Sequence, residues 1–283
     1  MTKAFCPGHI SCSFSPVYTN NVITTGSVGI GIRLNKGVTV MIEERSDGKT
    51  KIIMDGIESD AKITKHVINS LSPDRGYDVM IENQLPVSQG MGMSAAGAIA
   101  VGLCVTSVTG ADEYEAYKAA HIAEVLCGGG LGDVAGITGG RTPVRVKAGL
   151  QPYGRTIDTE LDINLTVAVL GPKIPTIGIL SDKAAVKAVV DAGIISVNEF
   201  IDTRTEKKLY EAASKFSSAA GFETNEVKNA LSLLRKDHEA SMCMLGNSIF
   251  TNASEDIVRN TLSNAEIFSL HSSTDGPRVI RKV

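Results

Sequence analysis

The run Pro86-Val-Ser-Gln-Gly-Met-Gly-Met-Ser-Ala-Ala96 constrains this chain more than any other segment. It gathers glycines, hydroxyls and small residues into one turn, and the apolar stretch Gly97–Leu103 follows directly. Gly90 and Gly92 allow a positive φ and allow a ligand to approach the backbone closely. A helix that begins here presents unpaired amides and the positive end of its dipole, which together bind anions. The run is therefore typical of a phosphate-binding turn, although a turn that only packs a helix on a sheet is the alternative.

Two other phosphate-binding motifs fit this region less well. The segment Gly90–Ala95 matches the dinucleotide fingerprint G-x-G-x-x-A, but that fingerprint requires the glycines to follow a strand immediately. Here the strand expected over Tyr77–Glu82 is separated from the glycines by the segment 83–89, and Pro86 would interrupt its ladder. A Walker A pattern, G-x-x-x-x-G-K-[ST], does not occur in the sequence.

Composition excludes several classes of protein. The 283 residues suffice for a large core in two lobes, and 43% hydrophobic with 21% charged residues is typical of a folded protein in water. The net charge of −3 gives no electrostatic basis for binding nucleic acid or an anionic membrane. Tryptophan is absent and aromatic residues make up 5%, which argues against stacking platforms for bases or sugars.

The cysteines and the first residues indicate a cytoplasmic protein. Five cysteines, an odd number without a C-x-x-C pair, are expected to be reduced and mostly buried. The segment 1–8 lacks the apolar core of a signal peptide. The uncharged segment 83–111 resembles a membrane span, but its helix-compatible part, 95–108, is too short to cross a bilayer.

The hydrophobic pattern predicts an α+β protein of two lobes, with residues 1–155 as the N-terminal lobe and 156–283 as the C-terminal lobe. In the first part we expect strands over 21–34, 38–43, 51–55, 77–82 and 142–147, and helices over 60–71, 95–108 and 112–127. In the second part we expect strands over 162–170, 248–251 and 267–271, and helices over 182–192, 203–220, 226–235 (extending toward Met244) and 254–263.

The helix expected over 112–127 carries a second set of polar residues. Asp112 is placed to cap its N-terminus, and Tyr117, His121 and Glu124 share one stripe while the other faces are apolar. Glu124 thus lies near the C-terminal end of a largely buried helix, where a carboxylate needs a cation. The alternative is a surface glutamate, or one paired with lysine or arginine. His121 lacks a third ligand at zinc spacing and is interpreted as structural.

Asp133 follows in the glycine-rich segment 128–140. The simple explanation is that it caps a short helix beginning at Val134; the functional one is that it faces a substrate hydroxyl. Ser94, Glu124 and Asp133 together supply what phosphoryl transfer needs, which is a phosphate cradle, oxygen ligands for Mg²⁺ and a group that orients the attacking hydroxyl. An aspartate with a pKa of about 3.9 is ionised at neutral pH and can accept that proton.

At these positions the chain resembles the GHMP kinases, which include galactokinase and the homoserine, mevalonate and phosphomevalonate kinases. Their signature P-x-x-x-G-L-G-S-S-A-A is closely matched by Pro86–Ala96, and their early motif A-P-G-K/R by Cys6–His9. The Mg²⁺-binding glutamate of the family falls on Glu124 and the catalytic aspartate on Asp133. The resemblance implies a kinase that uses ATP and Mg²⁺, with an N-terminal lobe like ribosomal protein S5 domain 2 and a C-terminal ferredoxin-like lobe.

The resemblance is stronger to one branch, the archaeal pantoate kinases. The matching segments are Pro7–Ile10, Thr25–Gly31, Ala120–Ala135, Gly139–Arg145 and Met242–Phe250. This branch implies phosphorylation of the 4-hydroxyl of (R)-pantoate to give 4-phosphopantoate and ADP in coenzyme A biosynthesis. The alternatives are a GHMP kinase for another small hydroxy acid or alcohol, such as homoserine or mevalonate, and a non-catalytic GHMP-like protein that binds a ligand. A homodimer is expected only by analogy with the family.

The phosphate loop departs from the family pattern at one hydroxyl. Met93 replaces the first of the paired serines, so Ser94 is left as the single hydroxyl of the pair. We expect the nucleotide to contact Pro86, Ser88, Gly90, Met91, Gly92, Met93, Ser94 and Ala95. Ser94 and Glu124 are the expected metal ligands, and Asp133, Arg145 and Ser94 the expected catalytic residues.

The substrate-binding residues are inferred from the acceptor that the resemblance implies. Pantoate carries a carboxylate, and Arg145 and Arg141 lie four residues apart on an expected strand, hence on one face. Their alternative is two surface arginines on an edge strand. Ser27 is expected to hydrogen-bond substrate or to serve only its turn. His9 stands where the family has lysine or arginine, so a fixed charge becomes a titratable one.

The third glycine-rich motif of the family is reduced here. The corresponding segment, Met244–Ser248, keeps one glycine, Gly246, which weakens the case for a nucleotide contact in this part of the chain.

Overall fold

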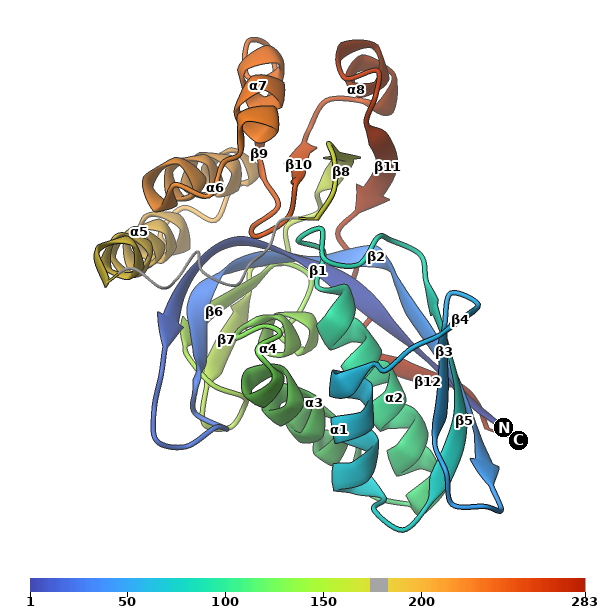
Figure 1. The fold of residues 1–283 in the computed structure, drawn as a ribbon. Coiled ribbons are helices and arrows are strands. Elements are labelled where there is room, and N and C mark those ends of the chain that lie inside the picture. Colours follow the sequence, from blue (N-terminus) through green and yellow to red (C-terminus); the bar gives the residue numbers. More distant parts are fainter. Residues whose placement is uncertain (174–182, 283) are drawn as a thin grey trace.

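The computed structural model describes residues 1–173 and 183–282, which form two sheets and the helices that pack on them (Figure 1). The expected α+β class is confirmed. All five cysteines are free thiols, and Cys127 is the exposed one among them. Within the described residues, no helix combines the length and the apolar character that crossing a membrane requires.

The first sheet is built around two long antiparallel strands, β1 (Thr2–Val17) and β2 (Gly26–Arg45). Its order is β12-β1-β2-β5-β3-β4, where β5 is Gly76–Asn83, β3 is Lys51–Met54, β4 is Ile57–Glu58 and β12 is Arg278–Lys282. The first half of β2 also pairs with β6 (Pro143–Lys147), which pairs with β7 (Arg155–Asp158). Register shifts between Pro7 and His9 and between Ser11 and Ser13 interrupt the ladder of β1 where the site lies.

Helices α1 (Lys62–Leu71), α2 (Met93–Thr109), α3 (Glu113–Cys127) and α4 (Asp133–Thr138) gather on one side of this sheet (Figure 1). The segment 95–106 of α2 is buried throughout. Small residues allow this depth, since a Cβ at Gly102 would meet Ala116 of α3 at 3.0 Å. The N-cap expected for α3 is confirmed, because the Asp112 carboxylate accepts a hydrogen bond from the amide of Tyr114 at 2.8 Å.

The second sheet has the antiparallel order β11-β8-β10-β9, formed by β8 (Asn164–Val169), β9 (Ala240–Met242), β10 (Ser248–Thr251) and β11 (Glu266–His271). Its helices are α5 (Lys183–Ile201), α6 (Glu206–Ala220), α7 (Asn225–Leu234) and α8 (Glu255–Thr261). Tyr210 of α6 and Phe250 of β10 belong to the same hydrophobic cluster as Ile30 and Ile32 of β2, so the two sheets share a core.

Several expected elements differ from the observed ones. The strands expected over 21–34 and 38–43 are one strand, β2, and β1 was not expected because Pro7, Gly8 and Pro16 indicate breaks. The helix expected to extend toward Met244 ends at Leu234, and β9 follows. The helix expected over 182–192 continues to Ile201, while Asp182 lies outside the described residues. Near the expected lobe boundary, β7 belongs to the first sheet, as does β12 from the chain end.

Candidate functional site

The glycine run forms a tight loop against β1. Gly90 and Gly92 have φ values of 75° and 62°, as expected from the sequence, and Ser88 also has a positive φ of 63°. Glycine is required at position 92 for two reasons. Its φ is positive, and a Cβ there would meet the carbonyl oxygen of His9 at 2.9 Å. The amide of His9 in turn donates to the Met91 carbonyl at 3.0 Å, which fixes the loop on the strand.

Helix α2 begins at the end of this loop with its first amides free of side-chain caps. Its N-cap is Gly92, and the residues of its first turn include no acid. Ser94, in the second helical position, is exposed. The start of this 17-residue helix therefore presents amides, a helix dipole and one hydroxyl to an approaching anion.

Gln89 ties the loop to the second sheet, a contact that sequence reasoning missed. Its side-chain amide donates to the Gly171 carbonyl at 2.9 Å and accepts from the amide of Asn247 at 3.0 Å. The Ser248 hydroxyl donates to the Gln89 carbonyl at 2.6 Å, and a Cβ at Gly246 would meet the same residue. The segment Met244–Ser248, which corresponds to the reduced third motif, thus contacts the glycine loop and holds it in position. In the sequence Gln89 is one polar residue of an uncharged run, and only the structure shows that it is buried.

Glu124 lies in the last turn of α3 and is only 2% exposed. It accepts a hydrogen bond from the Ser94 hydroxyl at 2.6 Å, and within residues 1–173 and 183–282 it has no lysine or arginine partner. Burial raises its pKa to about 7, which the hydrogen bond from Ser94 offsets only in part. Both simple explanations, a surface glutamate and an ion-paired one, are therefore wrong, and a cation bound here would favour the ionised form of the carboxylate.

Asp133 is the first residue of α4, but it does not cap the helix, because Gly132 occupies the N-cap. One carboxylate oxygen, Oδ1, lies 2.9 Å from Nδ1 of His9 and 3.4 Å from the Ser11 hydroxyl. Burial alone would raise the pKa of Asp133, but the His9 hydrogen bond and the positive charge of Arg145 outweigh it and lower the pKa. The carboxylate is therefore ionised at neutral pH, and its 25% exposure leaves it open to a substrate.

Arg145 on β6 is buried to 1% exposure with all three guanidinium nitrogens lacking a hydrogen-bond partner among the described residues. Space for it comes from glycines, since a Cβ at Gly132 would meet its Cζ at 2.9 Å and one at Gly29 its Nη2 at 2.7 Å. The Ser27 hydroxyl lies against the same glycine, Gly132. Burial lowers the pKa of Arg145 and Asp133 raises it, so a second anion is what this guanidinium lacks.

Two other residues considered from the sequence, Arg141 and His121, make contacts outside the group formed by Asp133, His9 and Arg145. Arg141 precedes β6, so the argument from strand faces does not apply to it, and its guanidinium pairs with Asp162 at 3.5 Å. His121 makes a hydrogen bond with the Val22 carbonyl at 3.1 Å, in line with the structural role expected for it. Ser11 also belongs to the site, because its hydroxyl donates to Asp133, and no sequence motif indicated it.

The segment that holds Ser94, Glu124 and Asp133 is similar to a known protein family. Residues 61–141, which contain α1 to α4, match the GHMP kinases N terminal domain. A pantoate kinase of Thermococcus kodakarensis is 30% identical over 263 residues, which are 88% of this chain and 87% of that protein. The chain belongs to the GHMP kinases.

Two further proteins are similar to this GHMP kinase over nearly the full length of the chain. A pantoate kinase of Methanospirillum hungatei is 28% identical over 98% of this chain and 96% of its own length. A solved structure described as a phosphotransferase related to the CoA biosynthesis pathway has a TM-score of 0.89 and is 27% identical, covering 100% of this chain and 99% of its own.

The oxygen donors of this GHMP kinase fit Mg²⁺. Glu124 supplies a buried carboxylate without a cation, and Ser94 supplies the hydroxyl that now bonds to it. Among the described residues, no group of three or more histidines, cysteines or acids is arranged to hold a metal. Mg²⁺ commonly takes one or two protein oxygens and completes its shell with phosphates and water, so this sparse donor set suits it better than zinc.

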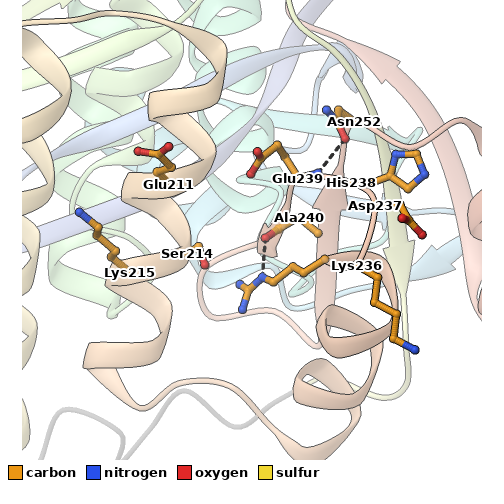
Figure 2. A pocket seen from close by; sticks show the side chains of 10 residues that line it. Glu211, Ser214, Lys215, Lys236, Asp237, His238, Glu239, Ala240 and Asn252 are labelled. Atoms are coloured by element: carbon orange, nitrogen blue, oxygen red, sulfur yellow. Dashed lines mark hydrogen bonds between the residues drawn. The ribbon is translucent and has the colours of Figure 1, made fainter.

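A separate hollow of about 550 Å³ lies beside α6 and β9 of this GHMP kinase, and none of the site residues described above lines it (Figure 2). Its charges are mixed and partly paired, as where Lys215 bonds to Glu199 at 2.7 Å and Arg235 donates to the Ala240 carbonyl at 3.0 Å. It therefore lacks the uncompensated buried charge that distinguishes the site around Arg145 and Glu124.

Proposed function

We propose that this GHMP kinase transfers the γ-phosphoryl group of ATP to the 4-hydroxyl of (R)-pantoate, giving 4-phosphopantoate and ADP in coenzyme A biosynthesis. Relatives named pantoate kinase that align with 88% and 98% of the chain support it. The observation that carries it is the buried Arg145 guanidinium, which lacks hydrogen-bond partners among the described residues and lies beside Asp133. An acceptor with a carboxylate and a hydroxyl satisfies both groups at once.

Binding of the two substrates follows from the charges of the site. The loop 86–92 and the first amides of α2 hold the phosphates of ATP. Arg145 binds the carboxylate of pantoate through its planar fork, and Ser27 lies within the same part of the site. Ser94 and Glu124 would hold Mg²⁺, which when bound neutralises charge on the phosphates.

Asp133 then directs the acceptor. Its ionised carboxylate accepts a hydrogen bond from the 4-hydroxyl and aims the oxygen at the γ-phosphorus. A bond forms between that oxygen and phosphorus, the bond to the β-phosphate oxygen breaks, and ADP leaves while the hydroxyl proton passes to Asp133. Since phosphoryl transfer is largely dissociative, orientation contributes more than proton removal.

The test is release of ADP from Mg·ATP with pantoate, mevalonate, homoserine and shikimate as separate acceptors. We expect turnover with pantoate. Turnover only with another acceptor would overturn the assigned substrate while leaving a GHMP kinase. Binding of ATP without turnover of any acceptor would instead indicate a non-catalytic protein that binds ligands.

A further inference from the structure

The side chain of His9 is fully buried and has no exposed surface that a substrate could contact. It lies on β1 at the register shift between Pro7 and His9, and its side chain is 0% exposed. Nδ1 points to Asp133, at 2.9 Å from Oδ1. The other ring nitrogen, Nε2, lies against backbone, since a Cβ would approach it to 2.0 Å at Gly31 and 2.4 Å at Gly136. The imidazole is thus enclosed between β2 and α4, and Asp133 is its one polar contact among the described residues.

This enclosure selects one protonation state. Nε2 is buried without a hydrogen-bond partner among the described residues, so a proton there would be an unpaired buried donor. The proton therefore belongs on Nδ1, where Asp133 accepts it, and Nε2 keeps its lone pair. Burial lowers the pKa of His9 and the charges of Arg145 and Arg33 lower it further, against the raising effect of Asp133.

The same contact sets the state of Asp133. Oδ1 is occupied by His9 and Ser11, which leaves Oδ2, beside Gly130, for the acceptor. A neutral N–H stabilises the ionised carboxylate and fixes its rotation without adding a positive charge that would weaken it as a proton acceptor.

We propose that His9 is a positioning residue whose neutral imidazole donates from Nδ1 to Asp133, fixing the orientation and the ionised state of that carboxylate without touching the substrate. This inference rests on the proposed function, because it assigns the role through Asp133. It differs from the expectation that His9 binds substrate or supplies a titratable charge.

The kinetic test compares three variants at this position. His9→Asn keeps an N–H near the place of Nδ1, whereas His9→Gln moves it outward and His9→Leu removes it. We expect His9→Asn to keep kcat within about tenfold of wild type and the other two to lose at least about 100-fold, with KM for pantoate nearly unchanged. A rise in KM with kcat retained would show substrate contact, and an Asn variant as poor as Leu would show that a cation is needed. Either result overturns the proposal.

A second measurement does not depend on catalysis or on the variants' stability. In ¹⁵N-histidine-labelled wild-type protein, nuclear magnetic resonance reports which ring nitrogen of each histidine is protonated, and the His9→Asn spectrum identifies the His9 signal by its absence. Should that variant not fold, the signal is identified by its through-bond correlations instead. We expect a neutral ring protonated at Nδ1 between pH 6 and pH 8. An imidazolium, or a proton on Nε2, would overturn the proposal, whereas failure of pantoate turnover alone would overturn only the substrate.

Discussion

Glycines leave the space that two buried side chains of this site, those of His9 and Arg145, occupy. The imidazole of His9 and the guanidinium of Arg145 are both almost fully buried, and each lies where an added Cβ would overlap it. The glycines concerned are Gly31 and Gly136 for His9 and Gly29 and Gly132 for Arg145. In each pair one glycine lies in β2 and the other lies in α4 or at its N-cap, so substitution of any of the four displaces a side chain of the site.

Arg145→Met is expected to separate stability from function. Removing the carboxylate-binding fork should raise KM for pantoate by about 100-fold, on the scale of charged hydrogen bonds. Without substrate the variant should be at least as stable as wild type, because it replaces a buried cation without hydrogen-bond partners by an apolar side chain of similar size. Steady-state kinetics and chemical denaturation measure the two effects.

Arg141→Met serves as the control for this prediction. Its guanidinium pairs with Asp162, away from the buried group, so KM should change little. Equal losses in the two variants would contradict the assignment of the carboxylate site to Arg145.

Glu124→Gln should change how stability depends on pH. Between the ordinary glutamate pKa of 4.5 and the raised value of about 7, the folded protein holds a proton that the unfolded chain has lost. Stability of the metal-free wild type should therefore fall as pH rises through this window, by up to about 3 kcal/mol at pH 8. Glutamine carries no such proton, so the variant should be the more stable form at pH 8 and not at pH 4.5. Denaturation curves without Mg²⁺ at both pH values measure it.

The exposed Glu82→Gln is the matched control and should leave the pH dependence of the wild type unchanged. Parallel pH profiles for wild type and Glu124→Gln would mean that the buried carboxylate does not resist ionisation.

At the scale of elements, the packing of α2 against α3 requires one of its glycines, Gly102, and does not require another, Gly97. A Cβ at Gly102 would meet Ala116 at 3.0 to 3.1 Å, including its backbone, whereas one at Gly97 would meet only Val38 at 4.0 Å. Gly102→Ala should cost about 1–3 kcal/mol by forcing the helices apart. Gly97→Ala should stabilise by about 0.5–1 kcal/mol, since alanine is the better helix former. Urea denaturation of both variants checks the contrast, which equal effects would contradict.

The sequence predicted elements where local chemistry decides them. The N-cap at Asp112 and the strands β10 and β11 were recovered because capping residues and short runs of isoleucine and phenylalanine are local signals. β1 was missed because its prolines and glycine indicate a break, while the register shifts that accommodate them depend on pairing with β2. Sequence motifs likewise singled out Ser94, Glu124 and Asp133. The partners Gln89 and Ser11 were beyond reach, because only the tertiary fold brings them to the site.

At the scale of the whole molecule, Arg33 joins segments that are distant in the chain. Its guanidinium donates to the carbonyls of Ser273 at 2.9 Å, Thr274 at 2.7 Å and Ile137 at 3.0 Å. It thereby connects β2, the end of α4 and the segment that leads into β12.

Arg33→Met should destabilise the protein by about 3 kcal/mol or more, because it leaves three carbonyls unpaired in a buried place. Arg45→Met removes two surface ion pairs, with Asp47 and Asp78, and should cost about 0–1 kcal/mol for each. Thermal and urea denaturation of the two variants measure the difference, and a small effect at Arg33 would mean that water satisfies these carbonyls.

The position of β12 in the first sheet has a consequence for folding during translation. Thr2 pairs with Lys282, so one edge of β1 is completed by β12, which is translated after the other strands of both sheets. The other strands of the first sheet are made earlier, and the second sheet is translated in between. Until β12 has been made, the nascent chain therefore exposes the edge of β1 along Thr2–Phe5, where it can pair with another chain. Completion of the first sheet therefore has to wait until the strands of the second sheet have been translated.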